Sequence, residues 1–187
     1  MTRIIAVSGS LRRGSFNTAL LRAAVGMAPA GIEIVEATIR GIPLYDGDVE
    51  AADGIPPAVA ALKEAIVAAD GLLLVTPEYN NSIPGVLKNA VDWLSRPPAD
   101  IGRVFGGRPV GIIGCSNGPF ATTLAQAAWL PVLRTLGTNP WFGARVLVPR
   151  GGSVFDAGGK LVDEQIRERL RRYVEGFAAF VARNRVA

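Results

Sequence analysis

Short apolar runs alternate along the chain with longer segments whose apolar residues recur every three or four positions. The short runs predict strands at about residues 3–7, 32–35, 72–75, 110–113 and 146–148. Among them, Leu72-Leu73-Leu74-Val75 is apolar throughout, as expected for a central parallel strand that is buried on both faces. The pattern therefore predicts a sheet whose strands are separated by helical segments.

The longer segments carry the periodicity of helices with one buried face. They predict helices that begin near Phe16, contain residues 59–69, run from Pro84 to Leu94, cover residues 121–136 and run from about Val162 to Val181. Proline is tolerated at the opening position Pro84, because its missing N–H would have no partner in a first turn. Pro131 lies inside the fourth helix and is expected to kink or divide it.

Alternation of five strands with five helices is typical of an α/β fold with a parallel sheet. The count predicts a flavodoxin-like three-layer sandwich, in which a five-stranded parallel sheet carries helices on both faces and ligands bind beyond the carboxyl ends of the strands. The 187 residues contain no repeat or linker-like break, so we expect one domain over residues 1–187.

Composition narrows the possible chemistry. The chain is 49% apolar, yet no apolar run approaches the roughly 20 residues that span a membrane. Met1-Thr2-Arg3 leads directly into a predicted strand, unlike a signal peptide, so we expect a cytoplasmic protein without membrane insertion. Cys115 is the single cysteine and histidine is absent, which excludes an intrachain disulfide, the common Cys/His zinc sites and a histidine base. An enzyme built from these residues is expected to borrow its chemistry from a cofactor, with no metal site.

The net charge of +4 is compatible with anionic cofactors, nucleic acid or no specific partner. The densest basic segment, RERLRR at residues 167–172, contains a glutamate and lies on a predicted helix. A solvated helix face explains this segment better than a nucleic-acid surface does, and no aromatic residue is interleaved with its charges. We therefore expect small-molecule partners and no nucleic acid.

The loop after the first predicted strand, residues 9–18, has the composition of a phosphate site. Small residues let backbone N–H groups approach an anion, and the helix that follows adds a partial positive charge at its N-terminus. A Walker A loop is excluded because Ser15-Phe16 replace its Lys and Ser/Thr, and no G-x-G-x-x-G run is present. The alternative is an ordinary strand-to-helix turn with Ser15 as N-cap. Side-chain donors and charge can come from Ser10, Arg12, Arg13, Ser15, Asn17 and Thr18.

Two further loops follow predicted strands at the same edge of the sheet. Residues 76–85, TPEYNNSIPG, offer backbone donors and flat side chains to a planar heteroaromatic ring; the alternative is an ordinary loop with a helix cap at Ser82 or Ile83. Residues 114–119 are small enough for a ring to pass close to the backbone. Within them, Cys115 is expected to be a packed residue rather than a nucleophile, because no histidine can activate it.

Three segments carry a resemblance to a known family. They are GSLRRGSFN at residues 9–17, IPLYDGD at residues 42–48 and PEYNNSIPGVLKNAVDWLSRP at residues 77–97. The chain resembles the NADPH-dependent FMN reductase family, which includes cytoplasmic chromate, quinone and azo-dye reductases. The third segment is long and specific, and the alternation of strands and helices extends the resemblance over essentially the whole chain.

The resemblance implies an FMN site built from the three loops, and it implies no catalytic side chain. Residues 121–124, ATTL, replace a Gly-Gly-Ala-Arg-like run of the better-known quinone and chromate reductases, so the acceptor is not assigned. The resemblance places the FMN phosphate on Ser10, Arg12, Ser15, Asn17 and Thr18, the isoalloxazine edge on Pro77, Glu78, Tyr79 and Asn80 with Ser82 nearby, and a further contact on Ser116 and Gly118.

The implied function is that of an FMN-dependent NAD(P)H oxidoreductase. NADPH or NADH would deliver a hydride to FMN, and a small acceptor (a quinone, chromate, an azo dye or free flavin) would take the electrons in a second, ping-pong step. Two alternatives are an electron carrier of the flavodoxin type and a flavin-binding module without turnover. Flavodoxins are usually strongly acidic, whereas this chain carries a net charge of +4.

The resemblance also implies a homodimer in which the helices after the third and fourth strands pack together. Some relatives form tetramers through an Arg, Tyr and acidic network, for which this chain has Leu124, Asn81 and Trp141. A tetramer would therefore need apolar contacts, for example at Trp141. The two helices carry more apolar residues than one buried face requires, which is consistent with a dimer interface. The alternative is that these residues only thicken the core of the monomer. These are Trp93, Leu94, Trp129, Leu130 and Leu133.

Overall fold

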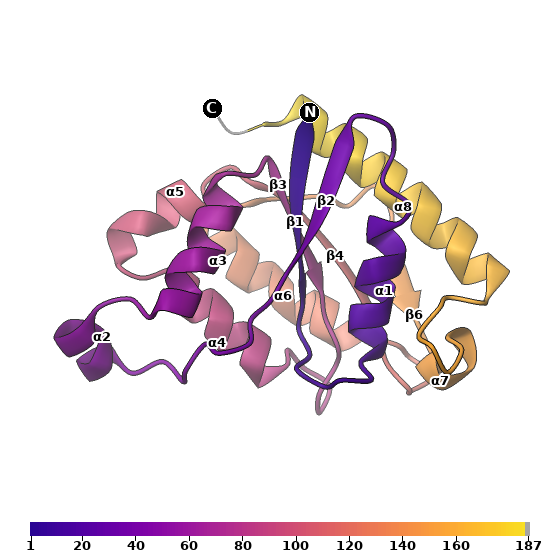
Figure 1. Ribbon diagram of the computed structural model, residues 1–187, viewed down its shortest axis with the longest axis horizontal. Helices are drawn as coiled ribbons and strands as arrows, with labels where there is room; N and C mark the ends of the chain where they lie inside the picture. Colours follow the sequence, from indigo (N-terminus) through magenta and orange to yellow (C-terminus); the bar gives the residue numbers. More distant parts are fainter. Residues whose placement is uncertain (186–187) are drawn as a thin grey trace.

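A parallel β-sheet forms the centre of the computed structural model, which describes residues 1–185 (Figure 1). Its strand order is β2-β1-β3-β4-β5, and the strand pairs are parallel. This order confirms the predicted flavodoxin-like α/β fold. The strands are β1 (Thr2–Ser8), β2 (Ile32–Ala37), β3 (Gly71–Val75), β4 (Pro109–Cys115), β5 (Asn139–Pro140) and β6 (Val146–Val148).

The fifth position of the sheet is occupied by two short strands in succession. β5 pairs with the beginning of β4 and β6 with its end, so both lie along the same edge. Between them the chain leaves the sheet at Trp141, whose indole ring packs edge-on against Tyr173 at a centroid distance of 4.8 Å. The sequence pattern predicted β6 but not β5, because two residues are too few to show an alternation.

Helices occur where the sequence shows helical periodicity: α1 (Phe16–Val25), α3 (Pro57–Val67), α4 (Gly85–Leu94), α6 (Thr123–Thr135) and α8 (Glu164–Arg183). α6 is continuous through Pro131, so a division there is wrong; Pro131 is exposed, where one missing backbone hydrogen bond is tolerated. Across residues 1–185, no helix combines the length and the apolar character needed to cross a membrane. Short elements without a periodic pattern were not predicted: α2 (Gly47–Asp53), the 3₁₀-helix Pro98–Asp100, α5 (Ile101–Phe105) and α7 (Gly151–Val154).

The helices cover both faces of the sheet and give the predicted three layers (Figure 1). α1 and α8 pack on the face where Ile4 and Leu73 are buried. α3, α4, α5 and α6 pack on the opposite face, where Ile5 and Leu72 are buried. Neighbouring strand residues therefore enter different cores, as the two-residue period of a strand requires. All loops at the carboxyl ends of the strands are left at one edge of this sandwich.

The residues expected to form spare dimer surface mostly lie inside the monomer. Their exposed fractions are 0% for Trp93 and Trp129, 3% for Leu94 and 1% for Leu133, against 41% for Leu130. Both indole N–H groups find internal partners, since Trp93 donates to the carbonyl of Pro43 at 2.9 Å and Trp129 to the hydroxyl of Thr76 at 3.2 Å. Using these residues as evidence for a dimer is therefore wrong: except for Leu130, they thicken the core.

The IPLYDGD segment, residues 42–48, is anchored to α4. Asn89 donates to the carbonyl of Pro43 at 2.8 Å and accepts from the backbone N–H of Tyr45 at 2.8 Å. The Tyr45 ring packs edge-on against Trp93 at a centroid distance of 5.0 Å. Beyond this anchor, α2 buries none of its residues and projects from the body of the molecule (Figure 1).

Candidate functional site

The loops after β1, β3 and β4 enclose a cavity of about 310 Å³ at the carboxyl edge of the sheet. Three predicted residues, Thr18, Asn80 and Ser82, do not line it. Phe16, Cys115 and Asn117 belong to the lining although they were not predicted. The cavity brings together nine of the residues predicted to bind FMN: Ser10, Arg12, Ser15, Asn17, Pro77, Glu78, Tyr79, Ser116 and Gly118.

One end of the cavity is formed by the N-terminus of α1. Ser15 is the N-cap, and its hydroxyl accepts from the backbone N–H of Thr18 at 3.2 Å. Within the described chain, the backbone N–H groups of Phe16 and Asn17 in the same first turn have no acceptor. Free N–H groups and the positive end of the helix dipole make this turn suitable for an anion. Ser15 can therefore cap the helix while the first turn still offers N–H groups to a phosphate.

Two neighbouring arginines differ in their access to the cavity. Arg12 lines the cavity and also a smaller hollow next to it, whereas Arg13 lines only hollows outside the cavity. Thr18 also faces away from the cavity, and its hydroxyl donates to the hydroxyl of Ser8 at 3.0 Å. Of the charged residues in the turn, Arg12 is therefore the one placed to meet an anion in the cavity.

The loop between β3 and α4 contains a two-residue turn. Tyr79 and Ser82 exchange backbone hydrogen bonds at 3.1 and 3.0 Å, and Asn80 and Asn81 between them have φ values of 50° and 60°. Positive φ at both central residues is typical of a type I′ turn, in which asparagine is favoured. The turn carries Asn80 and Ser82 outward. The alternative interpretation, a helix cap at Ser82 or Ile83, is wrong, since Pro84 is the N-cap of α4.

The carboxylate of Glu78 is engaged with another element of the structure. Its Oε2 atom accepts from the backbone N–H groups of Leu124 at 2.8 Å and Ala125 at 2.9 Å, at the N-terminus of α6. The residue preceding α6, Thr122, provides no side-chain cap of its own. Glu78 therefore caps α6 and ties two loops of the cavity together, which leaves its backbone rather than its carboxylate to face a ligand.

The loop after β4 is fixed by the loop after β6. The backbone N–H of Gly151 donates to the carbonyl of Ser116 at 3.1 Å, and that of Gly152 to Oδ1 of Asn117 at 3.3 Å. The hydroxyl of Ser116 accepts from the backbone N–H of Gly118 at 3.0 Å. Asn117 was missed by the sequence reasoning, although its position between Ser116 and Gly118 and the carboxyl-end rule could have identified it.

The back of the cavity is formed by Asn17 and Cys115. The amide of Asn17 donates to the carbonyl of Cys115 at 2.8 Å and accepts from its backbone N–H at 2.9 Å. Cys115 is 2% exposed, and burial raises the pKa of its thiol to about 12. A thiol that stays protonated is a poor nucleophile, which agrees with the expectation that Cys115 is a packed residue.

The chemistry of this lining suits FMN, whose phosphate monoester and planar isoalloxazine make different demands. The unpartnered N–H groups of Phe16 and Asn17, together with Arg12, suit the phosphate. The flat side chains of Pro77 and Tyr79 suit the ring. The N–H groups without a partner in the protein thus lie at the end of the cavity that suits a phosphate.

Comparison with known proteins identifies the family. Residues 2–152 match the model of the family described as NADPH-dependent FMN reductase. The chain belongs to this family. Its membership agrees with the resemblance carried by residues 9–17, 42–48 and 77–97.

Two relatives that align with this chain over almost their full length are described as reductases. The chain is 44% identical to an NAD(P)H-dependent FMN reductase of Pseudomonas aeruginosa, with 98% of this chain and 97% of the relative covered. It is 41% identical to a 2-hydroxy-1,4-benzoquinone reductase of a Burkholderia species, with 98% of each covered. Among solved structures, it resembles FerB, a flavoenzyme NAD(P)H:(acceptor) oxidoreductase of Paracoccus denitrificans, with a TM-score of 0.88, 30% identity and full coverage of both chains.

Proposed function

We propose that this chain is an FMN-dependent NAD(P)H oxidoreductase that reduces small acceptors, quinones first among them. Family membership supports this proposal, as does full-length similarity to a benzoquinone reductase. The observation that carries it is the cavity at the carboxyl edge of the sheet, which has free N–H groups and Arg12 at one end and the Pro77–Tyr79 loop at the other.

The proposed FMN contacts follow the predicted set, with roles refined by the geometry. Ser10, Arg12 and Ser15 would hold the phosphate, while Asn17 shapes the back of the cavity. The backbone of Pro77, Glu78 and Tyr79 would meet the ring edge, with Ser116 and Gly118 opposite. Thr18, Asn80 and Ser82, which do not line the cavity, would contribute through the turns that contain them.

Bound FMN would supply the redox chemistry, accepting a hydride from NAD(P)H and passing two electrons to the acceptor. The protein would position the reactants and provide backbone N–H groups near developing negative charge. Glu78 is the sole carboxylate among the residues that line the cavity, and its Oε2 atom is occupied by α6. Protons for a reduced quinone would therefore come from solvent rather than from a dedicated side chain.

The test is direct reduction of the FMN-loaded protein. Stopped-flow mixing with NADPH or with NADH should bleach the flavin, and a panel of quinones, chromate, an azo dye and free flavin should then restore its colour at rates that rank the acceptors. An electron carrier or a binding module would bind FMN but oxidise neither nucleotide. The net charge of +4 also argues against an acidic carrier of the flavodoxin type.

We further propose a homodimer, supported by exposed apolar side chains near the cavity. Tyr79 is 43% exposed, Val86 37%, Phe120 80% and Leu124 48%. The hydrogen bond from Leu124 to Glu78 places the start of α6 beside the cavity loop. Trp141, which packs on Tyr173, is less suited to the apolar contacts that a tetramer would need.

A further inference from the structure

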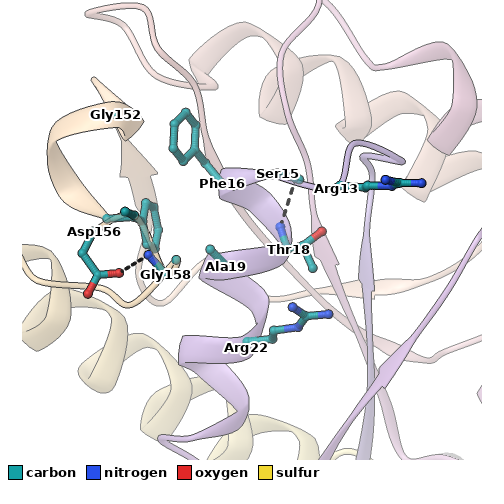
Figure 2. A pocket seen from close by; sticks show the side chains of 13 residues that line it. Arg13, Ser15, Phe16, Thr18, Ala19, Arg22, Gly152, Asp156 and Gly158 are labelled. Atoms are coloured by element: carbon teal, nitrogen blue, oxygen red, sulfur yellow. Dashed lines mark hydrogen bonds between the residues drawn. The ribbon is translucent and has the colours of Figure 1, made fainter.

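A second hollow lies beside the candidate FMN cavity, on the other side of the β1–α1 turn. One part, of about 480 Å³, spans the exposed face of α1 and reaches the loop at residues 152–159 (Figure 2). Another part, of about 230 Å³, lies between this turn and residues 36–40 at the end of β2. Arg13, Thr18 and Arg22 line both parts, so the two form one groove around the start of α1.

The groove is strongly basic where its two parts meet. The smaller part is lined by four arginines, Arg12, Arg13, Arg22 and Arg40, and by one carboxylate, Glu36. Arg22 neutralises Glu36 through two hydrogen bonds of 3.0 and 3.2 Å. Among residues 1–185, no ion pair engages Arg13 or Arg40. The groove therefore holds guanidinium groups without an anionic partner.

The positions of these arginines are partly fixed by the backbone. Arg40 donates from Nη2 to the carbonyl of Leu11 at 2.7 Å, which holds residues 38–40 against the β1–α1 turn. Its other N–H groups stay free for a ligand. The hydroxyl of Thr38 lines the same part of the groove. A fork of guanidinium donors supported by a hydroxyl is the arrangement that recognises a phosphate monoester.

Two aromatic rings lie along the larger part of the groove. The rings of Phe16 and Phe155, which both line it, stack at a centroid distance of 5.9 Å and an angle of 14°. In Figure 2, Arg13 and Arg22 lie on one side of α1, and Asp156 and Gly158 lie on the other. Oδ1 of Asp156 accepts from two turn N–H groups, at 2.9 and 2.8 Å, which fixes the side chain at this end. The volume of about 480 Å³ is within the range of small-ligand sites.

We propose that this groove binds the adenylate end of NADPH, with its 2′-phosphate on Arg13, Arg40 and the hydroxyl of Thr38. This inference rests on the proposed reductase function. FMN has one phosphate, for which the cavity on the Arg12 side already has donors. NADPH differs from NADH by one phosphate, and the unpaired arginines lie on the far side of the same turn. The chain would therefore prefer NADPH, and Arg13 would be a specificity-determining residue.

The test uses nucleotides that lack nicotinamide, so that binding is measured apart from turnover. Isothermal titration of the FMN-loaded protein should give tighter binding for adenosine 2′,5′-bisphosphate than for 5′-AMP, by about tenfold or more. Arg13→Ala should reduce this preference several-fold, and Arg13→Glu should abolish it. Arg134→Ala is the matched control, because this exposed arginine lies at the C-terminal end of α6, away from the carboxyl edge of the sheet.

Steady-state kinetics give the second readout. In Arg13→Ala, the ratio of kcat/KM for NADPH to that for NADH should fall by the same factor as the binding preference. Equal affinity of the native protein for the two adenine nucleotides, or an Arg13→Glu variant that keeps the preference, would overturn the inference. Failure of the native protein to oxidise either coenzyme would instead refute the reductase function, whatever the nucleotide titrations give.

Discussion

The side-chain amide of Asn17 forms the hydrogen bonds with Cys115 that a neighbouring strand would otherwise make. It donates to the carbonyl of Cys115 and accepts from its N–H, at 2.8 and 2.9 Å, and both residues are buried. β4 pairs with β3 only as far as Ile113, so the main chain at Cys115 lacks a partner on that side. Asn17 thereby fixes the start of α1 to the end of β4, the two elements that flank the cavity.

Replacement of Asn17 by Ala should destabilise the protein and weaken FMN binding. It leaves a buried N–H and a buried carbonyl without partners, which costs about 1–3 kcal/mol for each unsatisfied group. Urea denaturation should show a lower midpoint, and a fluorescence titration should show weaker FMN binding. Asn17→Asp keeps the acceptor for the N–H of Cys115 but sets a second carboxylate oxygen against its carbonyl, so it should be no more stable than Asn17→Ala. Unchanged denaturation of Asn17→Ala would contradict a structural role for this pair.

Arg12→Ala should weaken FMN binding without unfolding the protein. A charge-assisted hydrogen bond of about 1.5–3 kcal/mol corresponds to a loss of roughly tenfold to hundredfold in affinity. The native protein should also bind FMN more tightly than riboflavin, and Arg12→Ala should narrow this difference. Arg13→Ala is the control for FMN affinity, because Arg13 lies outside the cavity. If Arg13→Ala were the more damaging change, the phosphate would lie on the other side of the turn.

Steady-state kinetics with NAD(P)H and a quinone should be ping-pong. Both substrates are proposed to use one site beside the Pro77–Tyr79 loop, so the first product must leave before the second substrate enters. Double-reciprocal plots at several quinone concentrations should therefore give parallel lines. Intersecting lines would indicate that both substrates are bound together and that the site is larger than proposed.

Cys115 should resist alkylation in the folded protein. Burial raises the pKa of its thiol to about 12, so almost no thiolate is present at pH 8. In the unfolded chain the pKa of the thiol is near 8.5. Cys115 therefore makes its full contribution to the free energy of unfolding below pH 8.5, and this contribution declines as the pH rises toward 12. Mass spectrometry after iodoacetamide treatment at pH 8 should show label only in urea. Rapid labelling of the native protein would mean that the strand end opens.

Light scattering at micromolar concentration should find a dimer as the smallest stable species. Leu124→Glu should shift the protein toward monomer, because it places a charge among the exposed apolar side chains beside the cavity. Val162→Glu is a control of similar exposure, 46% against 48%, just before α8. A monomer with full reductase activity would argue against a dimer whose interface lies beside the cavity.

Patterns within single segments gave the main features of the fold. Uninterrupted apolar runs located β1, β3 and β4, because buried parallel strands need apolar side chains on both faces. The Asn80-Asn81 turn is also accessible from sequence, since asparagine tolerates positive φ. The alternation of strands and helices indicated the flavodoxin-like fold class, and the fold class in turn predicts the order of the strands.

Contacts between distant segments were not accessible in the same way. Glu78 is 46 positions from Leu124 in sequence, and nothing near either residue indicates that the carboxylate caps α6. The sequence leaves Trp93 and Trp129 compatible with either a dimer surface or a thicker core, because helical periodicity indicates one apolar face but not the thickness of the core beneath it. Their buried hydrogen bonds to Pro43 and Thr76 depend on tertiary packing.

The interrupted fifth strand makes this edge of the sheet a poor site for the addition of a strand from another chain. An exposed sheet edge is a template on which another chain can add a strand. At this edge, β5 has two residues and includes Pro140, and β6 has three residues and is followed by Pro149. Proline lacks the N–H that an incoming strand needs, and the excursion at Trp141 breaks the register. Addition of a strand is therefore disfavoured at this edge of the sheet.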